Sequence, residues 1–167
     1  FDDGNFEVKH GHLFEEEPAS QGHKGAFPCA AKEVRIIQDF VDTLMPLLTL
    51  SYHTKGDVLF WADRGTHSYF NGLDEKLNTK VANACGFKMA RVSRNPRDYG
   101  AGLENYIRAK TKRIGVCVEL SPPNDMVDQH PANMFKSLVW DKCKNMPILY
   151  LEELSRLYPR YKYLFEQ

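Results

Sequence analysis

Two residues whose types could do chemistry stand at the ends of apolar segments. His53 closes the segment LLTLSYH, and Glu119 lies near the end of IGVCVEL. A histidine ring can bind a metal ion or move a proton, and an ionised carboxylate in an apolar strand is costly unless it has a task. Each residue also has a structural interpretation, His53 as a hydrogen-bonded strand end and Glu119 as a carboxylate that faces solvent. Spacing alone leaves both interpretations open.

Other candidate residues lie in loops and charged runs. Tyr99 stands beside two glycines, where a surface turn residue and a mobile catalytic hydroxyl are both possible. His10 and His12 form an HxH pair that could bind a metal, although a solvated pair is the simpler interpretation in a polar arm. The charged runs at 15–17 and 110–113 are expected to be solvated.

These residues must be positioned by alternating helices and strands. Apolar residues at helical spacing predict helices, and short β-prone runs between turn formers predict strands. Residues 1–28 are polar and rich in turn formers, so we expect a loop-like arm. The pattern predicts helices over 34–44, 73–84 and 103–110, helical segments from Pro131 and from Pro147, and strands over 47–53, 58–61, 87–91 and 114–120. This alternation favours an α/β fold, a mixed β-sheet flanked by helices, in a single domain covering 1–167.

Composition and charge exclude several classes of protein. Lys plus Arg and Asp plus Glu number 22 each, so no net charge favours nucleic acid or an acidic membrane surface, and we expect neither as a partner. No apolar run approaches the length of a membrane span. The four cysteines form no CxxC pair, so neither a zinc ribbon nor a disulfide scaffold is indicated.

Two longer segments resemble the zinc carboxypeptidase family. SYHTKGDVLFW, at 51–61, is similar to the family segment that contains the last zinc-binding histidine. YGAGLENYIRAKTKRIGVCVEL, at 99–120, resembles the family's tyrosine loop, short helix and strand that ends in the catalytic glutamate. The resemblance covers most of the chain and is strongest for the bacterial branch that trims γ-D-glutamyl-diaminopimelate peptides of cell walls.

The resemblance implies a set of roles. His53 would bind zinc, and Glu119 would be the general base and acid that moves a proton between zinc-activated water and the leaving amine. Tyr99 would cover bound substrate, and Thr54 would lie beside the metal. Glu104 falls near the family position that reads the released side chain, where an acid would favour a cation; an exposed helix residue is the simpler interpretation.

The same resemblance implies that further parts of the site lie outside this chain. The family's other two zinc ligands form an HxxE motif well upstream, and its substrate-binding arginines also precede the matched segments. We therefore expect the chain to be the C-terminal part of a catalytic domain, with the N-terminal half as its missing partner and a peptide or peptidoglycan peptide as substrate. A noncatalytic peptide-binding or structural module of the same fold is the alternative. The compartment is left unassigned.

Overall fold

The computed structural model describes most of the chain, apart from parts of the N-terminal arm, two internal segments and the last residue. The described residues are 1, 15, 17–20, 23, 25–92, 102–123 and 130–166. They divide into two compact units. The first unit comprises 1–49, 62–67 and 92–115, and the second comprises 50–61, 68–91 and 116–167. The single domain over 1–167 stays a prediction.

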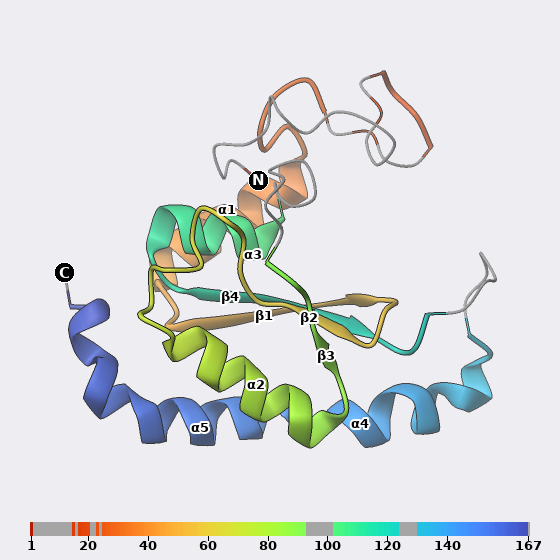
Figure 1. The fold of residues 1–167 in the computed structure, drawn as a ribbon. Coiled ribbons are helices and arrows are strands. Elements are labelled where there is room, and N and C mark those ends of the chain that lie inside the picture. Colours follow the sequence, from red (N-terminus) through yellow and green to blue (C-terminus); the bar gives the residue numbers. More distant parts are fainter. Residues whose placement is uncertain are drawn as a thin grey trace. The chain divides into compact units, whose positions relative to one another are not determined.

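The fold is α/β, with one mixed sheet of four strands flanked by helices, as predicted from the sequence (Figure 1). The strands are β1 (Leu48–Thr54), β2 (Val58–Phe60), β3 (Lys88–Met89) and β4 (Ile114–Leu120). Their order in the sheet is β1-β4-β2-β3. β2 runs antiparallel to β4 and parallel to β3. The two strands that follow each other in the chain, β1 and β2, are thus separated by the last strand.

β1 and β4 are parallel neighbours whose first residues are aligned. The amide of Ile114 donates to the carbonyl of Leu47 at 3.1 Å, just where both strands begin. In a parallel pair, a residue whose amide donates to a carbonyl of the neighbouring strand lies opposite the residue that follows that carbonyl. Ile114 is therefore opposite Leu48. Figure 1 shows both strands pointing the same way. The register follows along both strands because neither is interrupted.

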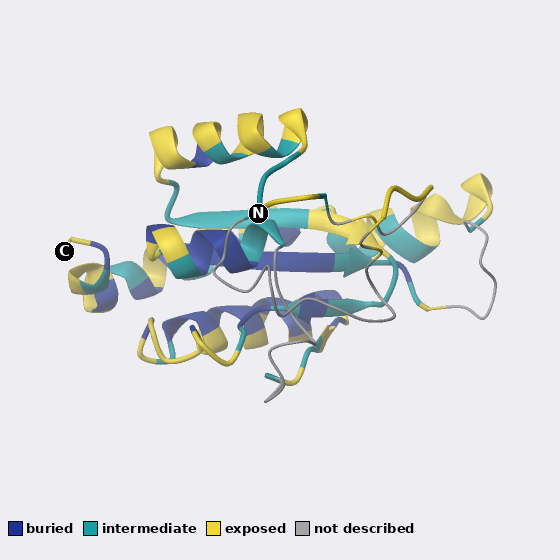
Figure 2. Cartoon of the chain, turned by 90° about the horizontal axis from the view of Figure 1, so that it is seen from above, coloured by how far each residue is buried: buried dark blue, intermediate teal, exposed yellow. Residues whose placement is uncertain are grey.

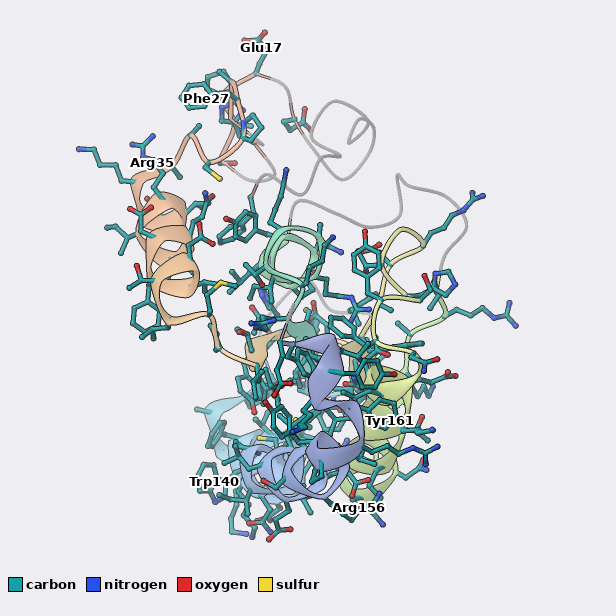
Figure 3. The ribbon with its side chains drawn as sticks, turned by 90° about the vertical axis from the view of Figure 1, so that its left-hand side faces the viewer. Glu17, Phe27, Arg35, Trp140, Arg156 and Tyr161 are labelled. Atoms are coloured by element: carbon teal, nitrogen blue, oxygen red, sulfur yellow. The ribbon has the colours of Figure 1, made fainter. Side chains whose placement is uncertain are left out.

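The second unit has a core between two helices and the sheet. α2 (Leu73–Cys85) and α5 (Met146–Tyr161) lie along one face of the sheet (Figure 1). Tyr150 of α5 is fully buried and donates to Oδ1 of Asn78 at 2.6 Å. Lys76 donates to the hydroxyl of Tyr161, which is labelled in Figure 3 with Arg156 of the same helix. These polar contacts fix the register of α2 against α5.

A broken helical segment precedes α5. It consists of a 3₁₀ turn at Ala132–Met134, a π-helical turn at Lys136–Trp140 and the single turn α4 (Asp141–Cys143). Lys142 forms an ion pair with Asp57, with 2.6 Å between Nζ and Oδ2. This contact attaches the segment to the bend before β2.

The first unit contains α1 (Lys32–Leu44) and α3 (Leu103–Tyr106), which continues as a π-helical turn. Its small core consists of Val41, Tyr106 and Ile107, with two partly buried hydrophobic residues packed against it. The hydroxyl of Tyr106 donates to the carboxylate of Asp42 at 2.7–2.8 Å. α1 buries only Val41, half-buries Val34 and exposes its other apolar residues to a large extent (Figure 2).

Most predicted elements appear close to their expected bounds, and the differences are local. The predicted strand 87–91 forms pairs only at Lys88 and Met89. The helical segment that begins after Pro131 is divided into short turns rather than continuous. No helix in the described part of the chain is long and apolar enough to cross a membrane. Residues 93–101 lie outside the described residues.

Candidate functional site

The sheet register makes His53 and Glu119 direct neighbours. Counting from Ile114 opposite Leu48, Glu119 of β4 falls opposite His53 of β1. Residues opposite each other in a parallel pair point to the same face, and neighbouring strands lie about 4.8 Å apart. The two residues therefore share one face of the sheet, at the carboxyl ends of two adjacent strands. The sequence placed each at a strand end, and the sheet brings them together.

His53 is exposed and held from one side by a hydroxyl. The Oγ of Ser51 lies 2.9 Å from Nε2 of the ring. Ser51 precedes His53 by two residues, so both side chains project from the same face of β1. A ring nitrogen fixed in this way orients the imidazole and leaves Nδ1 as the nitrogen that could bind a metal ion.

Glu119 has one partnered and one unpartnered carboxylate oxygen. Its Oε1 lies 3.8 Å from the thiol of Cys117, two residues earlier on the same face of β4. Its Oε2 is buried, and no partner for this atom lies among the described residues. A buried acceptor without a hydrogen bond costs about 1–3 kcal/mol. Oε2 is therefore a buried acceptor that the described residues leave unsatisfied.

The bend between β1 and β2 is attached to the chain just after Glu119. The amides of Gly56 and Asp57 both donate to the carbonyl of Ser121, each at 2.9 Å. A Cβ built on Gly56 would lie 2.9 Å from a methyl group of Val58 and 3.2 Å from Cβ of Glu119. The bend therefore packs closely against the carboxylate-bearing residue and fixes where β4 ends.

Thr54 lies on the other face of β1 from His53. It lines a cavity of about 620 Å³ together with Lys55, Ser121, His130 and apolar residues of the broken helical segment. The peptide bond between Thr54 and Lys55 is cis. The structure thus brings Thr54 to the ends of the same two strands, but not to the face that His53 and Glu119 share.

Of the remaining predicted site residues, Glu104 belongs to the first unit and Tyr99 lies outside the described part of the chain. Glu104 is half-buried in the first turn of α3, within the first unit, and its backbone packs against Gly115. Tyr99 lies outside the described residues, as do His10 and His12. The proposed roles of Glu104 and Tyr99 stay predictions.

The described residues do not by themselves make a metal centre. Among them, no group of three or more His, Cys, Asp or Glu side chains is arranged to hold a metal ion. One His-x-x-Glu spacing does occur in the chain, from His12 to Glu15, although the sequence-based prediction placed that motif only upstream. Glu15 is exposed and forms an isolated bridge with His23, whereas His12 lies outside the described residues.

Comparison with known proteins adds no relative. No protein-family profile matches the chain, and no curated protein sequence is significantly similar to it.

Three residues around the site were not singled out from the sequence. Ser51 and Cys117 contact His53 and Glu119 because residues two apart on a strand share a face, so the i−2 position was the signal. Gly56 lies between the two predicted strands 47–53 and 58–61. Its close approach to Glu119 depends on β4 lying between β1 and β2, which local sequence does not indicate.

Proposed function

We propose that this chain carries part of the active site of a zinc-dependent carboxypeptidase, with His53 as a zinc ligand and Glu119 as the general base. The observation that carries the proposal is the pairing of His53 with Glu119 on one face at the ends of two adjacent parallel strands. Functional groups of α/β proteins gather at such strand ends. The resemblance of 51–61 and 99–120 to the family supports the same two residues independently of the sheet.

The residues fit the chemistry of a bound zinc ion. The ring of His53 is exposed, oriented by Ser51 and open at Nδ1, which suits a neutral imidazole ligand. A zinc ion at this position would supply polarisation of the scissile carbonyl and a lowered pKa for bound water. Glu119 would take the proton of the attacking water on its carboxylate and then donate it to the leaving amine.

The site needs two further protein ligands, and the proposal assigns them to an HxxE motif outside these 167 residues. A carboxypeptidase site of this kind has two histidines and one glutamate, with the fourth position left for water. The motif at His12 and Glu15 is the in-chain competitor. The substrate would be a C-terminal peptide bond, with γ-D-glutamyl-diaminopimelate peptides as the specific candidate.

The test measures zinc and peptidase activity together on protein expressed from the complete reading frame. We expect about one zinc per chain, lost in His53→Ala and retained in His12→Ala. Glu119→Gln should keep zinc and lose activity by a factor of about 10²–10⁴, because general acid–base catalysis contributes that much.

Each alternative predicts a different result from the same measurements. Zinc undiminished in His53→Ala would refute the ligand assignment. Loss of zinc in both His53→Ala and His12→Ala would assign the HxxE ligands to the His12–Glu15 motif of this chain. Peptide binding without zinc or turnover in the unaltered protein would identify a noncatalytic module of the same fold.

Glu104 gives the proposal a prediction about specificity. A carboxylate near the released side chain would favour lysine or the ammonium group of diaminopimelate. We expect Glu104→Gln to lower kcat/KM for a peptide ending in lysine while leaving that for a peptide ending in leucine nearly unchanged. The control is Lys110→Gln, because Lys110 is an exposed residue of the same helical segment. Arg108 on this segment is buried and is therefore unsuitable as a control. Equal turnover of peptides with basic and with apolar C-terminal residues by the unaltered enzyme would contradict this specificity.

A further inference from the structure

Two free cysteines end neighbouring helices of the second unit. Cys85 is the last residue of α2 and is 7% exposed, and Cys143 is the last residue of α4 and is half-buried. Figure 1 shows α4 beside the C-terminal end of α2. The proposed peptidase chemistry uses neither thiol.

Contacts of the adjacent residues hold these two helix ends together. Lys142, next to Cys143, places its Nζ 5.9 Å from the ring centroid of Phe87, two residues after Cys85. The same Nζ donates to Oδ2 of Asp57, and the carbonyl of Asp57 accepts the amide of Lys88 at 2.9 Å. Asp57 thus bridges the chain that follows Cys85 and the chain that precedes Cys143.

The electrostatics of three side chains also indicate that the two thiols are close. Burial raises the pKa of the Cys85 thiol, and the charge of Cys143 raises it further. Burial, then the charges of Cys143 and Cys85, raise the pKa of Tyr52 to about 12. Because such effects fall off with distance, Tyr52, Cys85 and Cys143 form one cluster, on the opposite face of β1 from His53.

We propose that Cys85 and Cys143 are a pair that hydrogen peroxide oxidises to an intramolecular disulfide. The thiolate of one cysteine attacks an oxygen of the peroxide, the O–O bond breaks, and a sulfenic acid and a hydroxide form; the hydroxide takes the proton that this thiol had released and becomes one water. The second thiol then attacks the sulfenic sulfur, the S–O bond breaks, and the hydroxide that leaves takes the thiol proton as a second water. Two electrons pass from the two sulfurs to the peroxide. The bond ties α4, and with it the broken helical segment, to the end of α2.

The burial of both thiols sets the rate of this reaction. Burial raises the pKa of Cys143 as well as that of Cys85, so little thiolate is present at neutral pH. The thiolate is the reactive form, so the disulfide forms slowly at pH 7 and faster as pH rises. The pair therefore responds to sustained oxidation rather than to a brief pulse.

The test exposes reduced protein to hydrogen peroxide, blocks the remaining thiols and identifies linked peptides by mass spectrometry. We expect a Cys85–Cys143 peptide that is two hydrogens lighter than its reduced parts, with a yield that rises with pH. We also expect the melting temperature of oxidised protein to increase, because a cross-link that closes a long loop constrains the unfolded chain.

Single substitutions supply the controls. Cys143→Ser and Cys85→Ala should each abolish the linked peptide and the rise in melting temperature, and Cys143→Ser alters the less buried position if Cys85→Ala disturbs the core. Cys29→Ser is the matched control, because Cys29 is a half-buried free thiol of the first unit, and it should change neither. Sulfinic acids or links between chains, without a Cys85–Cys143 peptide in the unaltered protein, would overturn the proposal.

Discussion

At the scale of single residues, strand geometry predicts the nearest contacts of the two site residues but not their pairing with each other. His53 and Glu119 could be named from their segments, and their nearest partners follow from the two-residue period of a strand. Their pairing could not be read from local sequence. It depends on which of four strands lies beside which, and that is decided by packing between distant parts of the chain.

Tyr150 provides a prediction about stability at this scale. It is fully buried, and its hydroxyl donates to Oδ1 of Asn78, whose own Nδ2 already bonds the carbonyl of Asp74. Tyr150→Phe leaves that buried Oδ1 without its donor, so we expect the free energy of unfolding to fall by about 1–3 kcal/mol. Urea unfolding at neutral pH measures it. A loss below about 0.5 kcal/mol would mean that water replaces the hydroxyl.

The same residue makes stability depend on alkaline pH. Burial raises the pKa of Tyr150 above its ordinary value of 10.0. Its contribution to stability is therefore fully present below pH 10 and is lost as pH rises above that value, because the unfolded chain then releases the proton first. Unfolding of Tyr150→Phe should show a weaker decline above pH 10 than the unaltered protein, and an identical decline would contradict the assignment.

At the scale of elements, α1 was correctly predicted as a helix, but most of its apolar side chains are exposed. The apolar spacing predicted this helix with nearly its observed bounds, and Pro46 follows its end. Such apolar spacing is typical of a helix that packs along one face. Yet Ile36, Phe40 and Leu44, which recur every four residues on one side, are 66%, 61% and 58% exposed in the described structure, and only Val41 is buried.

This exposed stripe gives a prediction about α1. With the described packing, Phe40→Ser should change the free energy of unfolding by less than about 0.5 kcal/mol, as surface substitutions usually do. Val41→Ala on the same helix should cost about 2 kcal/mol, because it removes buried apolar surface. Chemical unfolding of both variants compares the two positions directly. A cost for Phe40→Ser as large as that for Val41→Ala would show that the stripe is covered in solution.

At the scale of the whole molecule, the fold class and the sequence of elements were predictable, and the topology was not. Helical and strand periodicities lie within single segments, so β1, α2 and β4 were found close to their observed bounds. The insertion of β4 between β1 and β2 involves contacts between residues some sixty positions apart, such as Val58 with Glu119. The division of the helical segment before α5 into short turns has no local signal in the sequence that we can identify.

The bend at Gly56 has a consequence for how this sequence can vary among relatives. A side chain at position 56 would meet Val58 on one side and Cβ of Glu119 on the other. An alanine could be accommodated only with a smaller residue at 58 or with β4 displaced at its end, so substitutions at 56 and 58 should occur together. In a relative whose position 56 varies freely, the carboxylate at position 119 would no longer need a fixed position.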